Sequence, residues 1–138
     1  MNTSNLQRAI YTALTGNLAL MAQINGVYAT KPQDDDSGDS SAFPYVSIGD
    51  ERAIPWDTKT NFGASVAVPI DIWSRSGNYI EAKDIGQAIW RALHHKPMTI
   101  AEANHTMTIM ESAVYIDDPD GQTKHGALSF SVSYTDIT

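Results

Sequence analysis

The chain has 138 residues, of which 42% are hydrophobic and 18% charged, a composition typical of one globular domain with a single core. Cysteine is absent, which excludes disulfides, thiolate nucleophiles and cysteine-ligated zinc. The formal net charge of -7 argues against a nucleic-acid reader, because binding to phosphates relies on Lys and Arg.

Two helices are predicted at the start of the chain. Ser4 and Gln7 form a capping-box pattern that starts the first helix at Ser4, and Gly16 is predicted as the left-handed residue at its end. At about 100° per residue, one core-facing stripe contains Leu6, Ala9, Ile10, Ala13 and Leu14. A second, short helix is predicted between its N-cap, Asn17, and a stop at Asn25 and Gly26.

An acidic segment at about 31–43, KPQDDDSGDSSAF, follows these helices. Its composition leaves nothing to anchor a packed structure, so a flexible loop is predicted. Carboxylates on such a loop are neither held rigidly nor shifted in pKa, which argues against catalysis or metal binding there. We expect the four carboxylates to face a channel or a partner: Asp34, Asp35, Asp36 and Asp39.

Two strands are predicted next. PYVSIGDE places Val46 and Ile48 on one face of the first strand, and RAIPWDTKTNFG is predicted to be a connection broken by Pro55 and Gly63. In ASVAVPIDIW, strict alternation puts one apolar set on the same face: Val66, Val68, Ile70 and Ile72. Pro69 has no amide to donate, which predicts an edge strand or a bulge.

A third helix is predicted from Asn78, which forms a capping box with Glu81, and it ends before Pro97. Its core stripe contains Ala82, Ile85, Ala88, Ile89, Ala92 and Leu93. Trp90 lies outside that stripe, where an interface contact and cover for a neighbouring loop are equally favoured. Trp56 is predicted to be an interface residue and Trp73 a core residue.

The chain closes with two predicted strands, HTMTIMESAVYI and ALSFSVSYT, joined by a turn at Pro119, Asp120 and Gly121. In the first strand the apolar residues change from odd-numbered to even-numbered positions, which predicts a bulge near Glu111 or Ser112. In the second strand Leu128, Phe130, Val132 and Tyr134 share one face. The other face carries no charge and includes Ser129, Ser131 and Ser133, which are predicted to contact another chain.

The element order predicts a single α+β domain, residues 1–138, with a mainly antiparallel sheet packed against two or three helices. The four histidines lack metal-ligand spacing and are interpreted as solvated residues at element ends. No nucleophile, phosphate-binding loop or cofactor motif occurs, so the sequence predicts no enzyme, metal or cofactor. Neither a signal peptide nor an apolar run of ~20 residues is present, which predicts a soluble chain without a membrane partner.

Six short stretches in order resemble the tail-completion, or tail-terminator, proteins of long-tailed bacteriophages, prophages and gene transfer agents. They are LQRAIYTALTG, the VY before the loop, FPYVSIGDE, PWDTKT, IDIWSRSG with EAKDIGQAIWRAL, and DPDGQTKHGALSFSV. The resemblance implies an α+β virion protein that forms a homohexameric ring, caps the tail tube, stops its polymerisation and meets the head-tail connector. DNA would pass through the ring without specific binding. The alternatives are a monomeric protein-binding module and a head-side stopper or adaptor.

Overall fold

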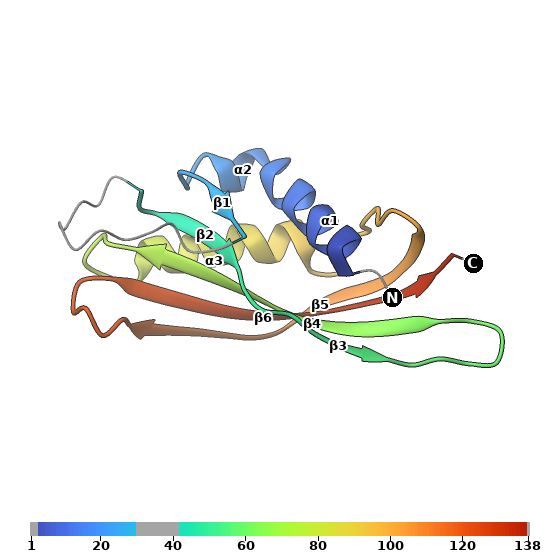
Figure 1. Ribbon diagram of the computed structural model, residues 1–138. Coiled ribbons are helices and arrows are strands. Elements are labelled where there is room, and N and C mark those ends of the chain that lie inside the picture. Colours follow the sequence, from blue (N-terminus) through green and yellow to red (C-terminus); the bar gives the residue numbers. More distant parts are fainter. Residues whose placement is uncertain (1–2, 30–41, 138) are drawn as a thin grey trace.

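The computed structural model describes residues 3–29 and 42–137. Its elements are α1 (Thr3–Thr15), α2 (Leu18–Met21), β1 (Val27–Tyr28), β2 (Tyr45–Ile48), β3 (Arg52–Pro55), β4 (Gly63–Ser74), α3 (Ile80–Leu93), β5 (Ala103–Asp117) and β6 (Lys124–Asp136). The helices cover one face of a six-stranded sheet and leave the other face open (Figure 1). The predicted α+β class is therefore confirmed.

Three long strands form the body of the sheet. The strand order is β1-β2-β4-β6-β5, and β3 pairs with β4 on the same side as β2. β4 pairs with β6 along its whole length, from Gly63 opposite Thr135 to Ser74 opposite Lys124. Among the described pairs, only β1 with β2 is parallel. β5 thus forms one edge of the sheet, and β1 and β3 lie toward the opposite edge.

The core lies between the sheet and the helices. Even-numbered residues of β4 and, from Gly126 to Tyr134, of β6 point toward the helices and are buried, as the alternation predicts. The helix stripes meet them: Leu6, Ile10 and Leu14 of α1 and Ile85, Ile89 and Leu93 of α3 are buried, and Ala13 and Ala92 pack at the margin. Each buried aliphatic side chain stabilises the fold by about 1.5–3 kcal/mol relative to exposure.

The prediction that residues 52–63 form only a connection is wrong. Arg52–Pro55 is strand β3, paired antiparallel with β4 from Ala67 to Ala64. The prediction of an edge strand at Pro69 is also wrong, because β4 is central. Pro69 faces the junction between β2 and β3, where its carbonyl accepts from the Gly49 amide at 2.8 Å. In an antiparallel strand the backbone nitrogen and carbonyl oxygen of one residue point toward the same neighbouring strand. The Pro69 nitrogen, which has no hydrogen to donate, therefore faces the gap between β2 and β3, and no hydrogen bond of the β4–β6 pairing is lost.

Several predicted helix ends differ from the structure. Gly16 has no positive φ, unlike Gly77 and Gly121, and Ser4 lies inside α1. Asn17 caps α2 as predicted, accepting from the Leu20 amide at 3.0 Å, although the helix ends at Met21. At α3 the Asn78 side chain accepts from the Ile80 amide, whereas the Glu81 carboxylate accepts from Ser74 instead of closing a capping box.

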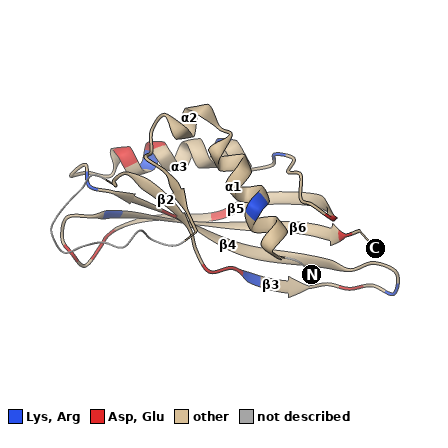
Figure 2. Cartoon of the chain, turned by 45° about the horizontal axis from the view of Figure 1, so that its top comes forward, with Lys and Arg blue, Asp and Glu red and all other residues tan. Residues whose placement is uncertain are grey.

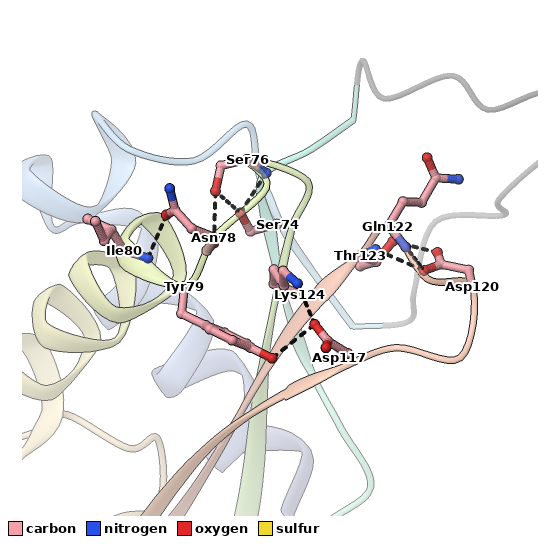
Figure 3. A network of polar contacts seen from close by, with 10 residues as sticks. All are labelled: Ser74, Ser76, Asn78, Tyr79, Ile80, Asp117, Asp120, Gln122, Thr123 and Lys124. Carbon is pink, nitrogen blue, oxygen red and sulfur yellow. Dashed lines mark hydrogen bonds and ion pairs between the residues drawn. The ribbon is translucent and has the colours of Figure 1, made fainter.

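The β5–β6 hairpin has the predicted turn and bulge. Register shifts occur between Met110 and Ser112, as predicted, and also between His105 and Met107. At the turn, the Thr123 hydroxyl donates to Asp120 and holds the pKa of this carboxyl at about 2. Nearby, Asp117 accepts from Tyr79 at 2.9 Å and pairs with Lys124 (Figure 3). These contacts tie the start of α3 to the tip of the hairpin.

We expect Ile89→Ala to lower the free energy of unfolding by about 2–5 kcal/mol, because Ile89 is fully buried between α3 and the sheet. Ile116→Ala is the matched control, since that side chain is 46% exposed on the open face and its loss should cost about 1 kcal/mol or less. Urea denaturation of both variants measures the difference. Equal losses would contradict the assignment of the core to one face of the sheet.

Candidate assembly surfaces

The open face of the sheet has a centre of small side chains. On β6 these are Ala127, Ser129, Ser131 and Ser133, and on β4 they are Ser65, Ala67 and Pro69. The three predicted serines therefore share one surface, on which Ser65 and Ser133 hydroxyls lie 3.2 Å apart. We call these seven positions the open-face trough.

Larger apolar side chains flank the trough on both sides. Along β5 they are Met107, Ile109, Val114 and Ile116, which pair with trough positions or with His125. Along β3 the flank holds Ile54, opposite Ser65 and 54% exposed, and the exposed cation Arg52, opposite Ala67. Val114 and Met107 are 50% and 48% exposed. Several exposed apolar side chains on one face are typical of a protein interaction site.

Trp56 belongs to the same face. Its amide donates to the Gly63 carbonyl at 2.9 Å, and its indole lies over Gly63, where an added Cβ would come within 2.6 Å of the ring. Any side chain at position 63 would displace the indole from this place. Trp56 remains 40% exposed beside Ile54 at the end of the β3–β4 hairpin. Trp56 therefore lies on the same face of the sheet as Ser129, Ser131 and Ser133.

Trp90 lies on the other side of the sheet. Its ring is 38% exposed and stacks on His94, with centroids 4.9 Å apart. A groove of about 380 Å³ opens beside it, lined by Lys83, Gly86, Gln87, Trp90, Met110, Ala113 and Tyr115. Gly86 is needed for this arrangement, because a Cβ there would lie 2.2 Å from the Tyr115 hydroxyl. Trp90 and Trp56 therefore lie on separate surfaces.

The end of α3 covers part of the β5 edge. His94 Nδ1 accepts from the Met110 amide at 3.0 Å, and the His95 amide donates to the Thr108 carbonyl at 2.8 Å. These contacts satisfy backbone groups that an edge strand otherwise leaves unpaired. The prediction that His94 is merely solvated is therefore wrong, and sequence gave no signal for its backbone partner.

Trp73 is not a core residue, contrary to prediction. It lies half-buried on the open face, where its Nε1 donates to Ser47 at 3.0 Å and its ring stacks on His125 at 4.1 Å. His125 in turn contacts Asp71 at 2.8 Å. His105 and His125 lie in strands and not in loops. The odd parity of Trp73 in β4 was the available signal, since the buried residues there are even.

A second charge-poor surface was missed by the sequence reasoning. Residues 3–29 contain a single charged side chain, Arg8, although α1 and α2 form the outer layer of the molecule (Figure 2). Tyr11 is 48% exposed and Leu18 is 84% exposed there. Natural surfaces are usually rich in charge, so the absence of Lys, Glu and Asp from this stretch was the available signal.

The remaining predicted features lie elsewhere. Asp34, Asp35, Asp36 and Asp39 lie outside the described residues. The last residue of the predicted loop, Phe43, is described and packs against Tyr45 and under the Arg75 guanidinium. Within residues 3–29 and 42–137, no three acidic or histidine side chains gather as a metal site would require. None of the helices in these ranges is long and apolar enough to cross a membrane.

Comparison with known proteins assigns the chain to a family. The chain matches the family described as Tail completion protein gp17 over residues 8–135. It is 32% identical to the tail completion protein gp17 of Bacillus phage SPP1 over 123 residues, which cover 89% of this chain and 87% of the relative. The chain belongs to the gp17 family of tail completion proteins. The resemblance noted in the sequence is therefore confirmed.

Solved structures share the fold of this gp17-family chain. A chain in the virion of a native gene transfer agent particle aligns with a TM-score of 0.82 at 22% identity, covering 94% of both chains. The structure of gp17 of bacteriophage SPP1 aligns with a TM-score of 0.57 at 28% identity, covering 94% of this chain and 88% of that one. The two-layer fold is thus shared with proteins of phage and gene-transfer particles.

We predict that Trp90→Ala costs about 1–2 kcal/mol of stability, well below the loss from Ile89→Ala, because the ring is off the core stripe and partly exposed. It should nevertheless weaken association with other chains, since exposed tryptophans often anchor interfaces. Urea denaturation of the variant measures its stability, and its incorporation into assembled tails measures its association with other chains. A stability loss as large as that of Ile89→Ala, with normal association, would show that Trp90 serves only the fold.

Proposed function

We propose that this chain is a structural, non-catalytic virion protein of the tail. Six copies form a ring at the head-proximal end of the tail tube, stop tube polymerisation and join the tube to the head-tail connector. The chain is made in the bacterial cytoplasm and is incorporated into phage or gene-transfer particles. Membership of the gp17 family supports the tail location.

The observation that carries this proposal is the uncharged trough on the open face. A monomer normally protects exposed sheet with Lys or Glu, because unguarded strands pair or pack with other chains. Here seven small, uncharged trough positions are flanked by exposed apolar side chains. Such a face is stabilised when another protein surface removes it from water.

The two tryptophan surfaces suit different contacts. Trp56 and the three serines lie on the open face, whereas Trp90 lies beside the α3–β5 groove. In a closed ring each copy contacts its two neighbours through two different surfaces, because a contact between two identical surfaces joins copies only into dimers. We assign the open face to contact between copies. The Trp90 groove is left free to receive the tube protein or the connector.

The acidic composition is compatible with a channel for DNA. The net charge of -7 and the aspartates 34, 35, 36 and 39 repel phosphates, and a six-fold ring would gather about 24 of these carboxylates. DNA would therefore pass without specific binding. The role of the segment rests on its composition alone.

We expect loss of this protein to leave DNA-filled heads together with tails that are abnormally long or unjoined to heads, because nothing would cap the tube. Electron microscopy of a deletion strain, with the intact gene supplied on a plasmid as control, measures both outcomes. Tails of normal length joined to heads in the deletion strain would contradict the proposal.

Changing Asp34, Asp35, Asp36 and Asp39 to Asn is expected to leave the fold intact and to slow DNA delivery, because phosphates would meet less repulsion and adhere more readily in the channel. A control of equal charge change converts Asp57, Asp84, Glu102 and Glu111 to their amides. Delivery rates of particles carrying each variant are compared at low and high salt. Equal rates for both variants would make the segment a passive linker.

A further inference from the structure

We propose that the contact between ring neighbours is sheet against helix: the outer surface of α1 and α2 of one copy lies in the open-face trough of the next. We define the N-terminal helix surface by its exposed side chains, Ser4, Arg8, Tyr11, Thr12, Leu18 and Ala19. This inference rests on the proposed ring and names the occupant of the open face as a second copy of this chain.

The dimensions of the trough fit a helix. β4 and β6 supply its floor, and the flanking rows on β3 and β5 are three strand spacings apart, about 14 Å. A helix with its side chains is about 10–12 Å wide. The paired region from Gly63 to Trp73 is about 34 Å long, whereas the 13 residues of α1 span about 20 Å. One helix and the short α2 therefore fit along the trough, which β3 borders from Ala64 to Ala67 and β2 from Ile70 to Trp73.

The charges select α1 and not α3 as the occupant. Burying an ion without a partner is costly, so an uncharged trough requires a nearly uncharged surface. The exposed side of α3 carries Lys83, Asp84 and Arg91. Residues 3–29 carry only Arg8. The paired strand positions of the open face carry Asp71, which contacts His125, and at the margin of the trough Arg52, which is opposite Ala67. The trough positions themselves carry no charge, so the nearly uncharged surface of α1 and α2 suits them better than α3 does.

The shape of the helix surface also matches a flanked trough. A hollow of about 510 Å³ lies between α1 and the β1–β2 strands, lined by Ser4, Gln7, Arg8, Tyr11, Thr12, Ala29 and Ile48. It offers space for one of the apolar side chains that flank the trough. Tyr11 and Leu18, at 48% and 84% exposure, would lose contact with water in the same step.

The area and the placement fit a ring. Four strands about 19 Å wide and 34 Å long present roughly 650 Å², close to the ~800 Å² that each partner buries in a standard interface. The two surfaces lie on opposite layers of the molecule (Figure 1). Each copy therefore offers its helices to one neighbour and its open face to the other, a head-to-tail contact that repeats until the ring closes.

Introduced cysteines test this contact, because the natural chain has none. Thr12→Cys is combined in turn with Ser129→Cys, Ser131→Cys or Ser133→Cys, which samples three positions along the trough. In assembled tails, at least one combination should give a ladder of disulfide-linked oligomers. Mixed single variants should give linked dimers only. The control pairs Gln87→Cys on α3 with the same serine positions and should give about tenfold less product, because only neighbouring sites share a high effective concentration.

The outcomes separate this inference from the proposed function. Electron microscopy and mass measurement first establish whether the variants form rings. Rings in which no trough position links to Thr12→Cys, or in which trough cysteines link to each other or to Gln87→Cys, overturn the sheet-on-helix contact and leave the ring intact. Absence of any ring in joined tails overturns the proposed function, and this inference falls with it.

A charged substitution in the trough tests the same contact independently. Ser131→Glu should lower the association of copies at least tenfold, because the carboxylate would be buried without a partner. Ser131→Ala, an uncharged control of smaller size, should associate normally. Adding Thr12→Lys to Ser131→Glu should restore part of the loss if the two positions meet. Normal association of Ser131→Glu in solution would contradict burial of the trough.

Discussion

The full-length pairing of β4 with β6 is the constraint on which the rest of the structure depends. Twelve register pairs, from Gly63 with Thr135 to Ser74 with Lys124, place the two strands side by side. Because side chains alternate across a strand, this one ladder assigns every residue of both strands to a face. The even-numbered face holds Val68, Ile70 and Phe130 against the helices, and the odd-numbered face holds the trough.

The same alternation keeps the residues of the core apart from those of the trough. A shift of one residue in the ladder would turn Ser129, Ser131 and Ser133 toward the helices and expose the buried apolar set. The core therefore holds the trough in position without using any trough side chain. This separation explains why substitutions on the open face are expected to change association more than folding.

Unlike the open face, the β5 edge is partly occupied by the molecule itself. The helix α3 ends beside this strand, and His94 and His95 bond to the backbone of Met110 and Thr108. The bulge between Met110 and Ser112 interrupts the remaining edge. Growth of the sheet by simple strand addition is therefore hindered at β5, which favours contact between chains through faces.

The sequence by itself determined which residues share a face or a stripe. Alternation in 64–73 and 127–135, the stripes of α1 and α3, the bulge near Glu111 and the off-stripe position of Trp90 all follow from local periodicity. Only the tertiary structure decided which strands are neighbours. That choice made β4 central despite Pro69, created β3, moved Trp73 to the open face and joined Trp56 to the three serines. The physical reason is that strand pairing is non-local: a period of two assigns residues to faces, but the partner of each edge depends on backbone groups far away in the chain.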